Sequence, residues 1–310
     1  MTILVTNCSS RKRSKDPKLS LLQTLVGSGL NETILNWQTA ISERTNLYRA
    51  MDLYAGRSVN EALRAAAIIG SPLFFISAGM GIVGSEDKIP AYNLTPVDSG
   101  NGLSLALSEH SVTASDWWSN LSSNGLSQLI HDQSKHLALI ALPASYLRML
   151  SEDLSRFTKA DVSRLRIFTS SAGKDEIPDF LRSAIMPYDE RLETVPQFAG
   201  TRSDFPQRAM RHYVEILQGH TFSLSVSRCL VEEFIKTCGR REVLTRRRLN
   251  DKQIKLLITT RWNSCQGLSS RLLRALRDDE MVACEQSRFS QLWREVRTER
   301  NIQPTKESVE

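Results

Sequence analysis

The strongest chemical signal in the sequence is a cysteine that follows a short apolar run at the N-terminus. Thr6-Asn7-Cys8 is followed by two serines and then by Arg11 and Lys12. Nearby cations favour the thiolate form of a cysteine, and the thiolate is the nucleophilic form. We therefore predict that Cys8 is a nucleophile. A buried structural cysteine at a strand end is the alternative, because no general base is adjacent in the sequence.

A second group of residues that could do chemistry lies between residues 52 and 95. Its three segments are Asp52-Leu-Tyr54-Ala-Gly56-Arg57, Ser77-Ala-Gly79-Met-Gly81-Ile-Val and Ile89-Pro-Ala-Tyr92-Asn-Leu-Thr95. Tyrosines can stack on a base or hydrogen-bond to it, and glycines let a base or a backbone approach closely. Core tyrosines and plain glycine turns remain the alternative interpretation.

The elements that would position these residues form an alternating pattern. Four short apolar runs have the length and composition of strands, and helical patterns separate them, such as Glu61–Ile69 before Gly70. This alternation predicts an α/β domain with a mostly parallel sheet and flanking helices. The predicted strands are Ile3–Thr6, Leu73–Ser77, Leu137–Leu142 and Arg166–Thr169.

Each predicted strand ends in small or turn-forming residues. In open α/β sheets, ligands bind beyond the carboxyl ends of the strands, so we expect these strand exits to form the rim of a pocket. Simple turns are the alternative. The exits are Cys8-Ser-Ser, Ala78-Gly-Met-Gly81, Pro143-Ala-Ser and Ser170-Ser-Ala-Gly-Lys174.

The C-terminal third is predicted to be a separate, basic and all-helical domain. A proline-rich stretch that ends at Pro206 places the boundary near residue 200, which gives domains 1–200 and 201–310. Residues 240–300 hold 15 Lys and Arg against 8 Asp and Glu, an excess of +7, whereas the whole chain carries +6. The predicted helices are Phe205–Leu217, Ser223–Thr237, Asp251–Thr260, Ser269–Arg277 and Glu285–Arg297.

This concentration of positive charge predicts a polyanionic partner, and the alternative is a solvated, arginine-rich surface. Two helices separated by a short break, with a basic stripe, are compatible with a helix-turn-helix-like module. The candidate nucleic-acid-binding residues are Arg246, Arg247, Arg248, Arg271 and Arg274.

The order and spacing of these motifs resemble those of proteins that handle 7-deazaguanines in nucleic acid. The matching segments are Cys8-Ser-x-x-Lys12, Leu53-Tyr-x-Gly56, Ile76-Ser-Ala-Gly-x-Gly-Ile-Val83 and Pro90-x-Tyr-x-Leu-Thr95, all within residues 1–100. The group includes the amidating domain of archaeosine synthase and bacterial proteins of the DUF328/DUF6884 type. Within it, the chain most resembles the DpdC component of bacterial 7-deazaguanine DNA-modification clusters.

The resemblance implies an enzyme that converts 7-cyano-7-deazaguanine (preQ0) in DNA into its 7-amido form. Cys8 would attack the nitrile, and Lys12 would hold the thiolate charge or deliver a proton. The acid or base would be Asp52, with Glu86 and Asp87 as open alternatives. The substrate-binding residues would be Ser9, Ser10, Arg11, Tyr54, Arg57, Ser77, Gly79, Gly81 and Tyr92.

Two other functions stay open at this stage. One is a non-enzymatic DNA-binding or stress protein in which Cys8 is incidental. The other is an amidotransferase or base-releasing enzyme that acts on a deazaguanine in RNA or DNA.

Other features of the sequence limit the classes of protein. The five cysteines are widely spaced and the histidines show no metal-binding spacing, so we expect reduced thiols, no metal and no cofactor. No apolar run is long enough to span a membrane and the N-terminus lacks a signal peptide, so we expect a cytoplasmic protein. DNA and other proteins of a DNA-modification cluster are the expected partners, and a membrane is not.

Overall fold

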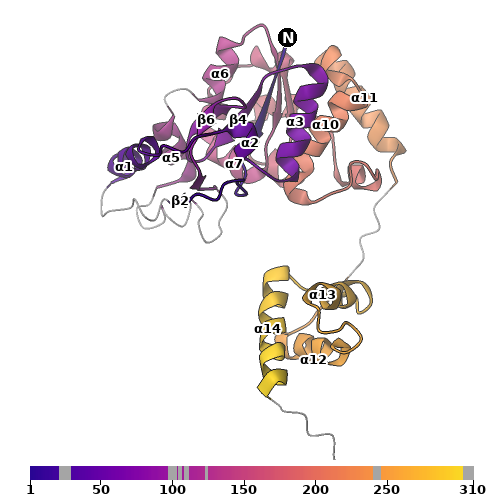
Figure 1. The fold of residues 1–310 in the computed structure, drawn as a ribbon. Coiled ribbons are helices and arrows are strands. Elements are labelled where there is room, and N and C mark those ends of the chain that lie inside the picture. The colour runs from indigo at the N-terminus through magenta and orange to yellow at the C-terminus, as the bar shows by residue number, and fades with distance from the viewer. Residues whose placement is uncertain are drawn as a thin grey trace, which may run out of the picture. The chain divides into compact units, whose positions relative to one another are not determined.

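The computed structural model describes residues 1–20, 29–96, 103, 107, 112–122, 125–239 and 246–302 of the 310-residue chain. The chain divides into two compact units, residues 1–241 and residues 242–310, which are considered separately below (Figure 1). The boundary predicted near residue 200 is therefore wrong by about forty residues.

A five-stranded sheet forms the centre of the first unit. Its order is β5-β4-β1-β8-β9, and every neighbouring pair is parallel except β4 and β5. This confirms the predicted α/β class with a mostly parallel sheet. The strands are β1 (Thr2–Asn7), β4 (Leu73–Ser77), β5 (Gly81–Gly84), β8 (Leu137–Ala141) and β9 (Leu165–Phe168).

All four predicted strands are present within a residue or two of their expected ends. They could be predicted because strands covered on both faces are continuous apolar runs, as in Ile3, Leu4 and Val5, which are at most 1% exposed. Strand β5 was not predicted. The glycine-rich exit of β4 turns back at Gly81, which has a φ of +71°, and pairs antiparallel with β4.

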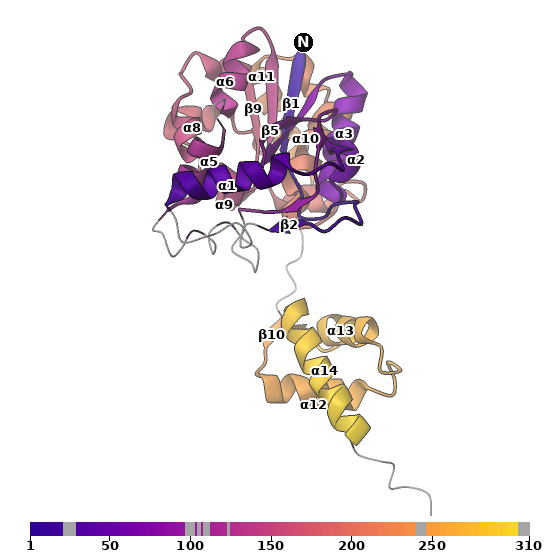
Figure 2. The ribbon, with the colours of Figure 1, turned by 60° about the vertical axis from the view of Figure 1, so that its left-hand side comes forward.

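Helices cover both faces of this sheet (Figures 1 and 2). On one face, α3 (Arg57–Ile69) packs against α10 (Phe205–Glu215), and both contact the central strands. The other face carries α5 (Ala114–Leu121), α6 (Leu126–Asp132), α7 (Ala144–Met149) and α8 (Ser151–Ser155). Helix α1 (Leu30–Ser42) packs against α5.

Small sheets, two short helices and the longer helix α11 complete the first unit. Two small two-stranded sheets, β2 with β7 and β3 with β6, lie outside the main sheet. The bounds are β2 (Leu19–Ser20), β3 (Tyr48–Arg49), α2 (Ala50–Leu53), β6 (Lys88–Ile89), β7 (Tyr92–Asn93), α9 (Ser171–Lys174) and α11 (Leu224–Thr237).

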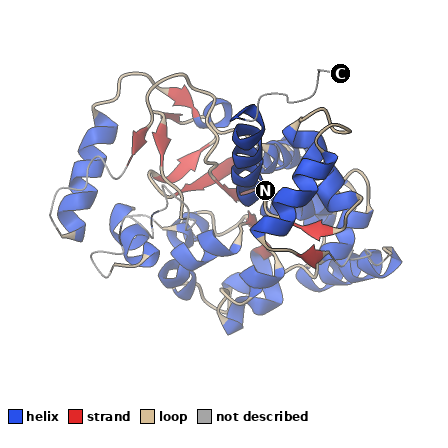
Figure 3. Ribbon diagram, turned by 90° about the horizontal axis from the view of Figure 1, so that it is seen from below, coloured by secondary structure: helices blue, strands red, loops and turns tan. Residues whose placement is uncertain are grey.

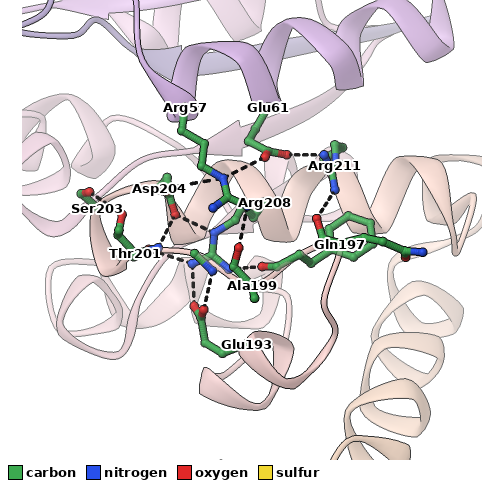
Figure 4. Close-up of polar contacts among 12 residues, drawn as sticks. Arg57, Glu61, Glu193, Gln197, Ala199, Thr201, Ser203, Asp204, Arg208 and Arg211 are labelled. Atoms are coloured by element: carbon green, nitrogen blue, oxygen red, sulfur yellow. Dashed lines mark hydrogen bonds and ion pairs between the residues drawn. The ribbon is translucent and has the colours of Figure 1, made fainter. Parts of the chain in front are cut away.

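An ion-pair network joins α10 to α3 and explains why the boundary lies beyond residue 200 (Figure 4). Arg211 pairs with Glu61 of α3 at 2.8 Å. Arg208, which is fully buried, pairs with Asp204 at 2.6 Å and with Glu193 at 2.5 Å. Because these charges are buried together, α10 is part of the first unit and not of a basic C-terminal domain.

The second unit is mostly helical and has its own core. It contains β10 (Arg247–Arg248), α12 (Asp251–Arg261), α13 (Ser269–Asp278), β11 (Val282–Ala283) and α14 (Gln286–Ile302). The core includes Ile254, Ile258, Leu272, Phe289 and Leu292. The expectation of an all-helical domain is corrected by β10 and β11, which pair in parallel. Helices nevertheless supply most of the regular structure of the described chain (Figure 3).

Candidate functional site

The predicted nucleophile lies where the strand order of the sheet reverses. In the sheet, β4 lies on one side of β1 and β8 lies on the other. The connections that follow β1 and β8 therefore run in opposite directions from the carboxyl ends of these two strands. In open α/β sheets, this switch point is the usual ligand site. Cys8 directly follows β1, and Tyr146 lies in α7, which follows β8. The Cys8 Sγ is 3.1 Å from the Tyr146 hydroxyl oxygen, so the two switch-point strands bring these groups together.

The backbone at Cys8 is held by a chain of side-chain hydrogen bonds. Gln207 of α10 donates from Nε2 to Asn7 Oδ1 at 2.8 Å, which turns the Asn7 amide nitrogen toward Cys8. Asn7 Nδ2 then donates to the Cys8 carbonyl oxygen at 2.7 Å. Tyr146 also donates to this carbonyl, at 3.2 Å. Because Asn7 already satisfies the carbonyl, the Tyr146 hydrogen can turn to the sulfur without leaving that oxygen unpaired.

Lys12 interacts electrostatically with Cys8 and is almost fully buried, with 8% of its surface exposed. Its Nζ donates to the Ser9 carbonyl at 2.9 Å and lies 4.1 Å from the centre of the Tyr92 ring. Burial lowers the pKa of Lys12, and the negative charge of a Cys8 thiolate acts in the opposite direction. A thiolate at Cys8 and an ammonium at Lys12 therefore stabilise each other in a site with little water.

Three hydroxyl groups form a directed hydrogen-bond chain in this site. The Ser77 hydroxyl accepts from the backbone nitrogens of Gly79 and Met80 at 3.2 and 3.0 Å, which occupies its two lone pairs. Its hydrogen must therefore point to the Tyr92 oxygen, 2.5 Å away. Tyr92 in turn donates to the Tyr54 oxygen at 2.6 Å. The hydrogen of Tyr54 is left as the outgoing end of the chain.

The tyrosines of the site are held in their neutral form. Burial raises the pKa of Tyr54, Tyr92 and Tyr146, and the charge of a Cys8 thiolate raises each of them further. They therefore act as hydrogen-bond donors near neutral pH, and a phenol whose pKa is raised gives up its proton only to a strong base.

Gly79 is required by side chains of the protein itself. A Cβ atom there would lie 2.9 Å from the Trp37 ring and 3.0 Å from the Tyr92 ring. Trp37 also donates from its indole nitrogen to the Gly79 carbonyl at 2.6 Å. The close approach that the sequence predicted at this glycine is thus explained by the packing of Tyr92.

The predicted carboxylates lie elsewhere. Asp52 is on the exposed side of α2, where it pairs with Arg49 at 2.7 Å, and Arg49 also reaches Glu86 at 3.2 Å. Asp87 accepts from the Gly84 backbone nitrogen in an exposed turn. In the described structure, each of these three carboxylates is exposed and bonds to a nearby residue. The side chain that contacts the Cys8 sulfur is that of Tyr146.

The other predicted binding residues fall into three environments. Ser77, Gly79, Gly81, Tyr54 and Tyr92 are buried in or beside the hydrogen-bond chain. Ser9 is half-buried and accepts from the Ala55 backbone nitrogen, whereas Ser10 and Arg11 are exposed. Arg57 pairs with Glu61 and donates to the Ala199 carbonyl, so it belongs to the α3–α10 network (Figure 4).

Sequence reasoning missed Tyr146 and Gln207. Tyr146 follows the exit Pro143-Ala-Ser, which was predicted to rim the pocket, so its position was a usable signal. Gln207 gave no such signal, because its contacts lie about two hundred residues away in the chain.

Several further properties bear on the chemistry. All five cysteines are free, and Cys8 is 1% exposed whereas Cys229 on α11 is exposed. Within the described ranges, no three His, Cys, Asp or Glu side chains are grouped as metal ligands would be. The helices described include none whose length and apolar character would let it cross a bilayer.

The predicted nucleic-acid-binding arginines all lie in the second unit. Arg271 and Arg274 are exposed on α13, and Arg247 and Arg248 are exposed on β10. Arg246 is half-buried and pairs with Asp278 at 3.0 Å. Comparisons found no protein family, curated protein or solved structure that matches this chain.

Proposed function

We propose that this chain is a cysteine-dependent enzyme that hydrates the nitrile of 7-cyano-7-deazaguanine in DNA to the amide. The observation that carries the proposal is the contact between the Cys8 thiol and the Tyr146 hydroxyl at the switch point, together with the electrostatic interaction of Cys8 with the buried Lys12. A nucleophile, a neutral hydrogen-bond donor and a fixed positive charge are the groups that covalent addition to a nitrile needs. The choice of a deazaguanine nitrile rests on the motif resemblance alone.

The proposed reaction begins with addition of the Cys8 thiolate to the nitrile carbon. A C–S bond forms, one C–N π bond breaks, and the nitrogen takes up a proton from Tyr54 or Lys12, which leaves a neutral thioimidate. Water then adds to the same carbon, with one of its protons going to nitrogen and the other returning from the oxygen to the Tyr54 or Lys12 group that gave up the first proton. The C–S bond breaks, Cys8 leaves as the thiolate, and the product is the amide. The net change is the gain of one water, with no cofactor consumed.

Each neighbour of Cys8 has a distinct part in this scheme. Tyr146 donates to the thiolate while Asn7 keeps the Cys8 carbonyl paired. Lys12 balances the thiolate charge. The chain from Ser77 through Tyr92 leaves the Tyr54 hydrogen available to the nitrogen on which negative charge develops.

DNA as the partner is supported by the charge of the second unit. Its residues 246–302 hold 13 Lys and Arg against 7 Asp and Glu. The connection between α12 and α13 spans residues 262–268, which is longer than the turn of three or four residues in a helix-turn-helix. The proposal therefore rests on charge and not on that motif.

The test is mass spectrometry of nucleosides from DNA that carries 7-cyano-7-deazaguanine, incubated with the purified protein. Wild type should convert the nitrile into a product heavier by one water. Cys8→Ala and Cys8→Ser should both abolish conversion, because serine without an adjacent base is a far weaker nucleophile. Cys229→Ala is the matched control and should convert normally, because Cys229 is exposed and remote from these groups in the contacts described.

The outcomes separate the remaining alternatives. A Cys8→Ala protein that still converts the nitrile would exclude covalent catalysis by this residue. A wild-type product that contains an amine instead of water would identify an amidotransferase. Folded wild-type protein that binds DNA and leaves the nitrile intact would favour the binding-protein alternative.

A further inference from the structure

An open hollow on the second unit is lined by four arginines. Arg246 and Arg248 come from the segment around β10, Arg277 from the last turn of α13, and Arg288 from the first turn of α14. Val282, Ala283, Cys284 and Glu285 also line it. The hollow has a volume of about 420 Å³. Four arginines from three elements thus line one hollow.

Three of these guanidinium groups are held in place by the unit itself. Arg246 donates to the Arg277 carbonyl at 2.9 Å and to Asp278 at 3.0 Å. Arg277 donates twice to the Cys284 carbonyl, at 3.2 and 2.8 Å. Arg288 donates to Asp251 and to the Leu249 carbonyl. Since a guanidinium has five N–H donors, each keeps at least two for a ligand.

Charge in the hollow favours an anion. Asp278 and Asp251 each offset one arginine, at Arg246 and Arg288. Among the contacts described for this unit, neither Arg248 nor Arg277 has a carboxylate partner, and Glu285 is an exposed acid whose side chain accepts from Ser287. The N-terminal end of the seventeen-residue helix α14 adds partial positive charge at the same place. Oriented N–H donors and net positive charge together form a phosphate site.

The other arginine face of this unit lacks these properties. Arg271 and Arg274 are both exposed on α13, and Arg271 donates only to the Gln266 side chain in the contacts described. Exposed, separately placed cations are readily screened by salt and gain little from any one phosphate.

We propose that the hollow bounded by Arg246, Arg248, Arg277 and Arg288 binds a backbone phosphate of nucleic acid and is the main DNA contact of the second unit. This inference rests on the part of the proposed function that has DNA as partner, and it does not depend on the chemistry at Cys8. The hollow is open, so it does not enclose a small anion. A polyanion gains from several weak phosphate contacts in addition to this one.

The experiment measures binding of the full chain to a short labelled duplex of ordinary DNA across a range of salt concentrations. The first variant is Arg248→Gln, which removes an exposed side chain and leaves the fold undisturbed. The second variant, called the hollow pair, combines Arg248→Gln with Arg288→Gln. The matched control, called the control pair, combines Arg271→Gln with Arg274→Gln, which removes the same number of charges from the same unit.

The hollow pair should weaken binding by about tenfold or more at low salt and reduce the slope of log K against log salt by about one to two. The control pair should change affinity by less than about twofold. Glu285→Gln should strengthen binding, because it removes a negative charge that lines the hollow. Equal losses from the two pairs, or a larger loss from the control pair, would overturn the proposal in favour of diffuse charge or the α13 face.

A second arm tests a free phosphate ion as the occupant. Inorganic phosphate that stabilises wild type but not the hollow pair, while both pairs bind DNA alike, would assign the hollow to free phosphate and overturn the proposal. The DNA used carries no nitrile, so an inactive Cys8 leaves all these results unchanged. Failure of the hollow and failure of the proposed reaction are therefore seen separately.

Discussion

At the scale of single residues, substitution of Tyr146 tests most directly the proposed role of Cys8. Its oxygen lies 3.1 Å from the sulfur, and its ring is buried in the core. A hydrogen bond to a charged group typically contributes about 1.5–3 kcal/mol. Tyr146→Phe keeps the ring, so we expect the fold to persist while nitrile conversion slows by roughly ten- to a hundredfold.

The matched control for this prediction is Tyr188→Phe. Tyr188 is also a buried tyrosine, but its hydroxyl bonds to His212 Nδ1 at 2.8 Å. Its removal should leave the conversion rate unchanged. If both variants lose activity to the same degree, the effect of Tyr146 is general loss of packing and not a contact with the nucleophile.

Lys12 gives a prediction about pH. Burial lowers its pKa below that of an ordinary lysine, and the proposed mechanism needs the protonated form. Wild-type activity should therefore be present below this lowered pKa and be lost as pH rises through it. In Lys12→Met, a buried apolar substitute of similar length, activity near pH 7 should fall at least about tenfold, and the alkaline loss should disappear.

The measurement is the conversion rate between about pH 6 and about pH 10 for both proteins. An alkaline loss that persists in Lys12→Met would assign that titration to another group.

At the scale of elements, the turn after β4 packs against the hydrogen-bond chain of Ser77, Tyr92 and Tyr54. Gly79→Ala would press a methyl group against the Trp37 and Tyr92 rings. We expect a loss of about 1–3 kcal/mol in the free energy of unfolding, together with loss of conversion, because Tyr92 can no longer bond to both Ser77 and Tyr54. Gly29→Ala is the control, since nothing lies within 4 Å of that site and its φ is ordinary. Full activity in a stable Gly79→Ala protein would show that conversion does not need this hydrogen-bond chain.

The strands could be predicted because each buried strand is a continuous apolar run in the sequence. Cys8 could be placed at a strand exit for the same reason. The acid or base could not be predicted, because whether a carboxylate faces the site depends on non-local partners. Asp52 has the expected spacing, yet it turns outward to Arg49, and the residue that does contact the thiol comes from beyond β8.

Helix α10 shows why the domain boundary could not be predicted. Its sequence, Phe-Pro-Gln-Arg-Ala-Met-Arg-His-Tyr-Val-Glu, is typical of a basic helix at a protein surface. Arg208 and Arg211 are nevertheless buried, because Asp204, Glu193 and Glu61 neutralise them. Only the folded chain reveals that these acids are available, since all three lie outside the helix.

At the scale of the whole molecule, two separate cores predict two separate unfolding transitions. The first unit has one large core and the second has its own smaller one. Phe289→Ala removes a fully buried ring from the smaller core, which typically costs about 3–5 kcal/mol. Calorimetry should show one transition shifted to lower temperature and the other unmoved. A single transition that shifts as a whole would mean that the units unfold together.

The central position of β1 has a consequence for synthesis of the protein on the ribosome. Cys8 is translated about two hundred residues before Gln207, yet its strand pairs with β4 and β8, and Gln207 supplies the bond that orients Asn7. At about 5–20 residues per second, some 10–40 seconds separate translation of Cys8 from that of Gln207. One edge of β1 lacks its neighbour until β8, which ends at Ala141, has been translated, and the bond from Gln207 to Asn7 forms later still. The growing chain therefore carries Cys8 without the Gln207–Asn7 hydrogen bond until Gln207 has been translated.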